Sequence, residues 1–411
     1  MYRFLSTILV FLALPCMVRA GDTDSQEHPP GRVFFDARAR QTRYAGPGRE
    51  EASPTDVNEV LIGYFGPSSP SDPRAGDMWR AACLAIEQAN KAGGYEGLPF
   101  RLVVGWSDNP WGSGVKEVAR MAYVHRVWAV VGGVDGPSTH LAEQVVAKAR
   151  LTLLSSASTD KTVNLANVPW MFSCLPGDHV QAPILARAIA SRIGKRPFLL
   201  VSAVDHDSHL FTVELTASFV KHRLAPSYHF EFKPGEKDYA ALVEKIVDSE
   251  APALVLIAGA QESARLISAV REKGFDGLVF GGPRMGCRSF PEDAGKAAEG
   301  VIFPMLYTPG ESSDSFEKTF TFRFGHRPDY LAAHTYDGVN LLIAAIRKAG
   351  LNRARICDAA RTLSPWQGIT GSIRWDSLGS NSRSVGLGTI KEGRMQELLP
   401  NEPCGSPKCR L

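Results

Sequence analysis

Two loops rich in small and hydroxyl-bearing residues are the first places where this sequence could bind a small molecule. Residues 128–131 form a short apolar run that stops at a pair of glycines, the pattern of a buried parallel strand, and residues 134–139 follow. Residues 151–154 repeat the design before a second loop at residues 155–159. Because crevices of open α/β sheets lie beyond strand ends and helix-opening N–H groups attract anions, we expect a ligand pocket here. Its candidate residues are Asp135, Gly136, Ser138, Ala157, Ser158 and Thr159.

The alternative for one such loop is that its serines and threonines only cap helices. Two loops in tandem favour a pocket. A further loop at residues 108–112 carries Trp111, whose ring could cover the apolar part of a ligand.

Residues 205–209 are a second candidate for chemistry, because carboxylates and imidazoles follow a predicted strand at close spacing. Such groups can bind a metal ion, and the weak candidates are Asp205, His206, Asp207 and His209. Acidic residues that open a helix usually cap it, so capping is the competing interpretation. The sequence lacks G-x-S-x-G, H-E-x-x-H and G-x-x-x-x-G-K motifs, and we expect neither an enzyme nor a cofactor.

The N-terminus has the pattern of an export signal. Arg3 precedes an apolar run at residues 4–14 that is too short to span a bilayer, and residues 18–20 have the spacing of a signal-peptidase site. We expect cleavage after Ala20 and a periplasmic location. A lipoprotein anchored at Cys16 is the alternative, although Pro15 fits a lipidation box poorly. In an oxidising compartment Cys404 and Cys409 are the expected disulfide pair.

Composition excludes other classes of protein. Hydrophobic residues make up 44% and charged residues 22%, which is typical of a globular chain, and a net charge of +3 argues against a nucleic-acid surface. Residues 21–56 are rich in Pro, Arg, Glu and Gly, and we expect an extended N-terminal arm there.

From residue 59 onward, strands and helices alternate, which predicts parallel sheets with right-handed crossovers. The units are too many for one sheet, and the pattern breaks near residues 176–177. We therefore predict an α/β fold with two doubly wound parallel-sheet lobes joined by a hinge. The expected limits are 57–177 plus about 304–360 for lobe 1, 178–303 plus about 361–395 for lobe 2, and 396–411 for a C-terminal tail.

Several short motifs, in order, resemble the type I periplasmic binding proteins of leucine, isoleucine and valine. They include GDMWRAACLAI at residues 76–86, NKAGG at 90–94, VVGG at 130–133, STD at 158–160 and DYAALV at 238–243. AGKAAEGV at 294–301 and YDGV at 336–339 continue the series, so the likeness runs from about residue 59 to residue 394.

The resemblance implies an extracytoplasmic receptor, a monomer that closes two lobes around a small ligand and delivers it to the membrane permease of an ABC importer. In that family, main-chain N–H groups and hydroxyls of the two loops hold the ligand carboxylate. Ala157 and Thr159 match the second loop, whereas Gly136 stands where a serine is usual, which removes one hydrogen bond worth about 1 kcal/mol. Asp178 matches a hinge-side aspartate, with a helix N-cap as the alternative.

The other half of the expected pocket departs from the family pattern. The acidic residue that the family uses near the ligand ammonium falls at Pro283 or Arg284, and its aromatic positions fall at Asp207 and at Gly259 or Ala260. Arg284 would repel an ammonium and instead suggests an anionic or carbonyl group on the ligand, unless it lies in solvent. We therefore expect a polar, carboxylate-bearing ligand other than a standard branched-chain amino acid. The alternatives are a sensory protein that presents its closed form to a membrane receptor, and a metal-binding secreted protein.

Overall fold

The computed structural model describes residues 44, 47–73, 75–236 and 238–399, together with all their side chains except those of Pro110 and Trp111. These residues belong to one compact unit, Arg38–Leu411. The expected signal peptide, most of the N-terminal arm and the expected Cys404–Cys409 pair lie outside the described residues.

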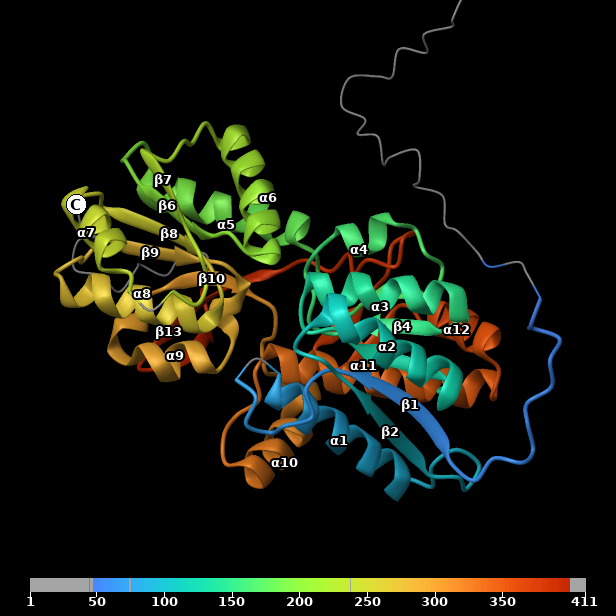
Figure 1. Cartoon of the computed structure of the whole chain (residues 1–411). Coiled ribbons are helices and arrows are strands. Elements are labelled where there is room, and N and C mark those ends of the chain that lie inside the picture. Colours follow the sequence, from blue (N-terminus) through green and yellow to red (C-terminus); the bar gives the residue numbers. More distant parts are fainter. Residues whose placement is uncertain (1–43, 45–46, 74, 237, 400–411) are drawn as a thin grey trace, which may run out of the picture. The chain divides into compact units, whose positions relative to one another are not determined.

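A five-stranded parallel sheet forms the core of lobe 1, in the order β2-β1-β3-β4-β5 (Figure 1). The strands are β1 (Val60–Phe65), β2 (Phe100–Gly105), β3 (Ala129–Gly132), β4 (Thr152–Ser155) and β5 (Met171–Ser173). Every residue of β3 and β4 is buried, because helices cover both faces of the sheet, and this explains their continuous apolar runs.

Amphipathic helices cover this sheet. Helix α1 buries Ala81, Leu84, Ala85 and Ala89 on one face. Its main partner is α11, a long helix that is also part of the core around β1 and β3. The helices of this part are α1 (Gly76–Lys91), η2 (Pro110–Gly114), α2 (Val115–Ala119), η3 (Arg120–Val124), α3 (Gly136–Ala149), α4 (Thr162–Leu165), η6 (Glu311–Ser313), α10 (Asp314–Phe324), α11 (Tyr330–Ala349) and α12 (Arg353–Thr362).

A seven-stranded sheet forms the core of lobe 2, in the order β14-β13-β10-β9-β8-β6-β7. Its strands are β6 (Leu199–Ala203), β7 (Tyr228–Phe232), β8 (Ala253–Ile257), β9 (Leu278–Gly281), β10 (Ile302–Met305), β13 (Gly386–Lys391) and β14 (Arg394–Glu397). Strands β6 to β10 are parallel, whereas β13 runs antiparallel to both β10 and β14. The predicted parallel sheet therefore carries an antiparallel pair of strands at this end, β13 and β14.

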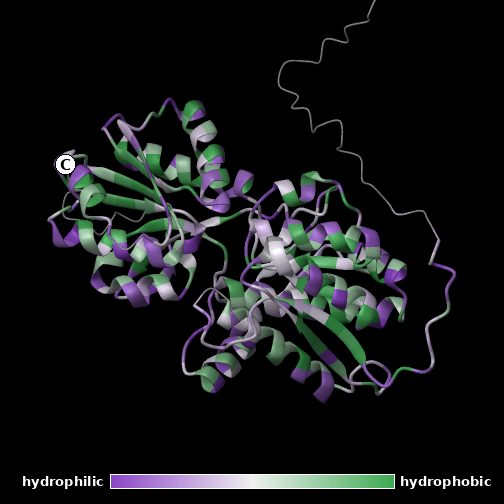
Figure 2. Cartoon of the chain, in the orientation of Figure 1, coloured by the Kyte–Doolittle hydropathy of each residue, from purple (hydrophilic) through white to green (hydrophobic). Residues whose placement is uncertain are grey.

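Helices pack on both faces of the second sheet, where two separate apolar clusters lie. These helices are α5 (Asp178–Ile193), α6 (His206–His222), α7 (Ala240–Asp248), α8 (Ala260–Glu272), η4 (Pro283–Gly286), α9 (Ser289–Ala294) and η5 (Gly295–Ala298). Figure 2 shows the strands of both sheets as largely hydrophobic and the helices as mixed, as expected for layers around a core. A small hairpin, β11 (Trp366–Gly368) and β12 (Gly371–Ile373), stands apart from both sheets.

The parallel strands of the two lobes repeat one order, in which the first strand lies between the second and the third. This arrangement places a switch point between β1 and β3 in lobe 1 and between β6 and β8 in lobe 2. The prediction of two doubly wound α/β lobes is confirmed. The exact sequence limits of the lobes stay a prediction.

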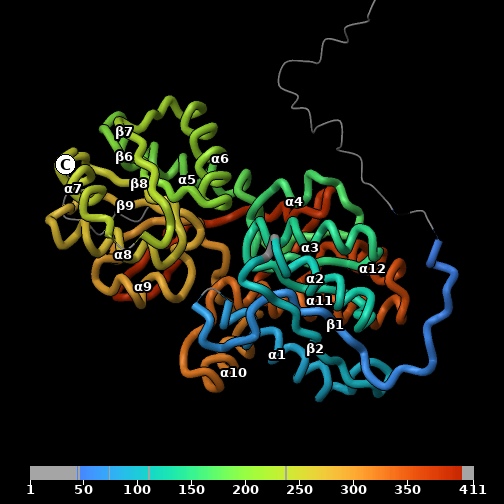
Figure 3. The backbone as a smooth tube through the Cα atoms, viewed as in Figure 1, coloured from blue at the N-terminus to red at the C-terminus, as the bar shows by residue number. Residues whose placement is uncertain are grey.

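Three chain segments connect the lobes, and hydrogen bonds hold them together as a hinge. Buried Asn381 donates from Nδ2 to the carbonyl oxygen of Cys174 at 2.5 Å, and Arg383 donates to that of Leu306 at 2.9 Å. These contacts join residues that follow β5, β10 and β12, and the segments can be followed by their colours in Figure 3.

The described residues include no disulfide and no helix that could span a membrane. The four described cysteines are free thiols: Cys83 is half-buried, and Cys174, Cys287 and Cys357 are buried. Within the described part of the chain, no helix combines the length and the hydropathy needed to span a bilayer.

Candidate ligand-binding cleft

A cavity of about 390 Å³ lies where the carboxyl ends of strands from the two lobes face each other. Lobe 1 lines it with residues that follow β1, β3 and β4, and lobe 2 with residues that follow β6, β8 and β9. Among the lining residues are Val134, Asp135, Thr159, Asp207, Ala260 and Arg284. The cavity therefore lies where the switch points of the two sheets predict a ligand-binding crevice.

Acidic groups outnumber basic groups in the cavity wall, which also carries apolar side chains such as Phe211, Ile257 and Leu331. Carboxyl side chains outnumber guanidinium groups seven to two: the acids are Asp72, Asp77, Asp135, Asp205, Asp207, Glu262 and Asp329, and the bases are Arg284 and Arg288. Burial raises the pKa of Asp207 to about 6. Burial, assisted by the nearby Asp77, raises the pKa of Asp329 to about 6 as well. The wall favours hydrogen-bond donors and positive charge on whatever binds there.

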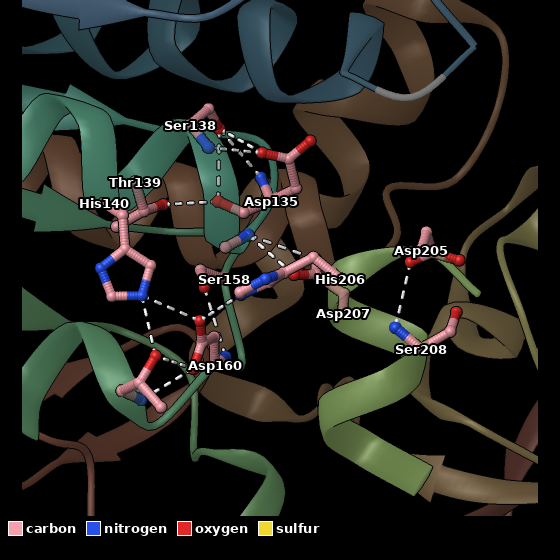
Figure 4. A network of polar contacts seen from close by, with 12 residues as sticks. Asp135, Ser138, Thr139, His140, Ser158, Asp160, Asp205, His206, Asp207 and Ser208 are labelled. Atoms are coloured by element: carbon pink, nitrogen blue, oxygen red, sulfur yellow. Dashed lines mark hydrogen bonds and ion pairs between the residues drawn. The ribbon is translucent and has the colours of Figure 1, made fainter. Parts of the chain in front are cut away.

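The N-terminus of α3 is the anion site that the first loop predicts, and protein carboxylates occupy its donors. Asp135 caps the helix and accepts from Ser138 N at 2.8 Å, and Ser138 Oγ in turn accepts from Val134 N at 3.0 Å. Asp207, which belongs to lobe 2, accepts from Gly136 N at 3.0 Å (Figure 4). Asp207 thus takes the place at which a ligand carboxylate is expected.

The geometry explains why a glycine stands at position 136. A Cβ atom there would lie 2.5 Å from Asp207 Oδ1 and 3.0 Å from both Asp160 Oδ2 and His206 Cδ2. The serine that is usual in the resembled family could not fit without moving these groups. The absence of a serine hydroxyl that could bind the ligand therefore goes together with the contact between Gly136 and Asp207 of the other lobe.

The second loop reaches the cavity only through Thr159. Ala157 and Ser158 are buried and do not line the cavity, and Ser158 Oγ instead accepts from Asp160 N at 3.2 Å. Their ligand-binding role stays a prediction, which their burial away from the cavity wall does not favour.

Asp178 is not an N-cap, because Gly177 occupies that position and Asp178 is the first helical residue of α5. Its backbone N–H donates to Thr159 O at 2.8 Å, beside the cavity. Its carboxyl group is buried, Oδ1 has no hydrogen-bond partner among the described residues, and burial raises its pKa well above the ordinary value. Asp178 thus lies behind Thr159 rather than in the cavity wall.

Arg284 lies in the cavity wall and not in solvent, with 24% of its side chain exposed. Its Nη2 donates to Val134 O at 2.9 Å and lies 3.7 Å from Asp207 Oδ2. The interpretation of a solvated loop arginine is therefore wrong, and the positive charge is partly balanced by Asp207. Ala260 also lines the cavity as the first residue of α8. Trp111 falls in η2, and its side chain lies outside the description.

The weak candidates for a metal site at residues 205–209 do not come together. Asp205 is the N-cap of α6 and accepts from Ser208 N at 3.0 Å, Asp207 binds Gly136, and His209 is exposed. The helix-capping alternative is therefore confirmed for Asp205. Helix periodicity explains the failure, since successive side chains on α6 point in different directions.

His206 instead meets His140 and Asp160 of lobe 1. His206 Nε2 lies 2.9 Å from Asp160 Oδ2, and His140 Nε2 lies 3.1 Å from the same oxygen (Figure 4). The bond to Asp160, with a smaller contribution from Glu143, raises the pKa of His140 to about 9. Burial alone would raise the pKa of Asp160, but the two imidazoles lower it below its usual range.

Comparison with known proteins identifies the family. Residues 59–394 match the family model described as periplasmic binding protein, and the chain belongs to this family. Its relatives include a protein of the branched-chain amino acid type that the sequence resembles.

Two relatives come from Pseudomonas aeruginosa. One is a leucine-, isoleucine-, valine-, threonine- and alanine-binding protein, 23% identical over 79% of this chain and 87% of its own length. The other is an amino acid binding protein, 24% identical over 78% of this chain and 87% of its own length.

Solved structures share the fold. The substrate-binding protein LivJ of a branched-chain amino acid transporter from Streptococcus pneumoniae, in complex with isoleucine, has a TM-score of 0.76 at 20% identity and covers 83% of this chain and 100% of its own. A solute-binding protein of an ABC transporter from R. palustris, in complex with benzoate, has a TM-score of 0.74 at 13% identity, with 83% and 95% coverage. The same fold thus holds an aliphatic amino acid in one protein and an aromatic acid in another.

Proposed function

We propose that this protein is an extracytoplasmic receptor that closes two lobes around a small, polar, carboxylate-bearing organic molecule and delivers it to the permease of an ABC importer. The cavity of about 390 Å³ between the strand ends of both lobes is the observation that carries the proposal. This volume is in the range of small-molecule sites. The receptor acts as a periplasmic monomer in this proposal, with a cleavable signal peptide.

The cavity wall argues against a standard branched-chain amino acid. Leucine, isoleucine and valine gain about 1.5–3 kcal/mol from burying their side chain against apolar surface. Here Asp207, Gln261 and Glu262 line the lobe 2 side of the cavity among apolar residues such as Phe211 and Ile257. An aliphatic side chain placed there would cover charged and amide groups and remove their hydration, which costs free energy.

Arg284 supplies the complementary contact for an acid group. Its guanidinium has five N–H donors, and it donates from Nη2 to Val134 O. It lines the cavity, so its other donors can face a ligand carboxylate in a charge-assisted pair. The acidic residues around it favour further hydroxyl or amine donors on the same molecule.

Thermal unfolding of residues 21–411 tests the proposal. We would compare branched-chain amino acids, hydroxy and amino carboxylic acids, aromatic acids and amines that lack an acid group. A ligand present at one hundred times its dissociation constant stabilises the folded state by about 2.7 kcal/mol, which shifts the midpoint clearly. We expect polar organic acids to give the largest shift. Stabilisation by leucine, isoleucine and valine alone would contradict the ligand class, and no stabilisation by any small molecule would contradict the receptor.

A matched pair of variants assigns the acid-binding group. Arg284→Met should abolish the shift caused by the best acid. Arg187→Met makes the same change at an exposed position on α5 and should leave the shift unchanged. An equal shift in both variants would show that Arg284 does not bind the ligand.

A further inference from the structure

Three metal-binding side chains meet beside the ligand cavity, from both lobes. His140 belongs to α3, Asp160 follows β4, and His206 belongs to α6. One ligand atom from each lies within 4.8 Å of the others. None of the three lines the cavity, so the cluster is distinct from the proposed solute site.

The distances within the cluster suit a tetrahedral ion after small movements. A Zn²⁺ ion with bonds of about 2.0–2.1 Å keeps neighbouring ligand atoms roughly 3.4 Å apart. The two imidazole nitrogens lie 3.1 and 2.9 Å from Asp160 Oδ2, a few tenths of an ångström closer than that. Inserting the ion therefore requires each imidazole nitrogen to move a few tenths of an ångström away from the shared oxygen, and the two nitrogens, which lie within 4.8 Å of each other, to adopt a separation of about 3.4 Å.

Supporting groups already orient two of the three side chains. Asp160 Oδ1 accepts from both the N–H and the hydroxyl of Thr162 at 2.7 Å, which leaves Oδ2 for the imidazoles. Glu143 Oε2 lies 3.4 Å from His140 Nδ1, the arrangement that orients metal-binding histidines. Glu143 is 4% exposed, and its Oε1 has no hydrogen-bond partner in the described residues. A buried carboxylate behind the histidine would offset the positive charge of an ion.

The first turn of α3 is shaped to let lobe 2 reach this cluster. Gly136 has Asp160 Oδ2 and His206 Cδ2 each 3.0 Å from the position of an added Cβ. Any side chain at this position would separate His206 from Asp160. The contact between His206 and Asp160 therefore depends on a glycine at position 136.

We propose that His140, Asp160 and His206 bind a divalent transition-metal ion, Zn²⁺ by preference, which fastens α6 of lobe 2 to lobe 1. Two imidazole nitrogens and one carboxylate oxygen suit Zn²⁺ and disfavour Mg²⁺ and Ca²⁺, which require oxygen ligands. Water completes the fourth position. Because the ion binds only when the lobes meet, it and the solute favour the same arrangement, and each raises the affinity for the other.

Calorimetric titration of residues 21–411 with zinc chloride, after removal of metals by a chelator, tests the site without any solute. We expect one Zn²⁺ per chain that His206→Ala weakens at least about 100-fold, a larger loss than outer groups usually cause. His209→Ala removes an exposed histidine from the same helix and should bind like the wild type. Magnesium chloride should give no heat of binding.

Cobalt substitution gives a second readout. Co²⁺ should produce the intense visible absorption of a four-coordinate site in the wild type and in His209→Ala, but not in His206→Ala or Asp160→Asn. Circular dichroism checks that each variant is folded, and His206 is exposed enough that its loss should be tolerated. Equal Zn²⁺ affinity of wild type and His206→Ala, or no Zn²⁺ binding, would overturn the proposal and leave the cluster as a hydrogen-bonded contact. Neither result would bear on the solute receptor.

Discussion

Gly136→Ala is the sharpest single test of how the lobes meet. The new methyl group would lie 2.5 Å from Asp207 Oδ1, below any normal contact, and 3.0 Å from Asp160 Oδ2 and from His206 Cδ2. Three groups would have to retreat, and two of them belong to lobe 2. The backbone at position 136 is helical, so alanine causes no strain within α3 and even favours the helix by up to about 1 kcal/mol.

The substitution should instead weaken the contact between the lobes. The hydrogen bond from Gly136 N to the Asp207 carboxylate is a charged one, for which about 1.5–3 kcal/mol is typical, and water would recover part of it. A net loss of about 2 kcal/mol corresponds to roughly a 30-fold shift from closed to open lobes. We therefore expect an alanine variant whose midpoint of unfolding is unchanged or higher but whose lobes open.

Small-angle scattering with the wild type as reference measures this opening as an increased radius of gyration. A fluorescence pair, one dye on each lobe, gives the same quantity at low concentration. Gly310→Ala is the control, because an added Cβ there meets no atom within 4 Å. An unchanged radius of gyration in Gly136→Ala would refute the idea that this glycine is needed for the lobes to close.

Two further predictions concern stability. The raised pKa of Asp329 stabilises the fold below pH 4, and this contribution is lost as the pH rises through about 6. Between pH 4.5 and pH 7.5, the free energy of unfolding of Asp329→Asn, measured with urea, should therefore rise by up to roughly 2 kcal/mol relative to that of the wild type. The control Asp314→Asn, at an exposed position, should show no such gain. A difference that stays constant with pH would count against this. Asn381→Ala removes the hydrogen-bond partner of Cys174 O and of Arg383 N in the hinge, and it should lower the free energy of unfolding in urea by about 1–3 kcal/mol. Ser382→Ala, at the exposed neighbouring position, should lower it by less than about 1 kcal/mol. Equal losses in the two variants would contradict a special role of Asn381.

Much of the fold could be predicted because its strands are buried on both faces. Residues 60–65 and 129–132 are continuous apolar runs, and they became β1 and β3. Strand β13 could not be recognised in the same way, since only Gly388 and Ile390 of its residues are buried and Thr389 and Lys391 interrupt the apolar pattern. Its antiparallel direction depends on the return of the chain to lobe 2, which no local pattern encodes.

The site was harder to predict, because its contacts join distant parts of the chain. The spacing of the two loops predicted correctly that strand ends would face a cavity. It could not show that Asp207 would fill the anion site of Gly136, 71 residues earlier, or that His206 would turn toward Asp160, 46 residues earlier. A clue was present in Gly136 itself, since a glycine in place of a usual serine signals a close approach of other atoms.

The bond between Asp207 and the N-terminus of α3 has a consequence for background ions. A carboxylate attached to the same molecule competes at an effective concentration of about a millimolar or more. Free acetate, chloride or phosphate below that level should lose this competition at Gly136, and so should any solute that offers only one weak acid group. The chain thus excludes small anions from this helix end, which leaves Arg284 in the cavity wall as the group available to the acid of a solute.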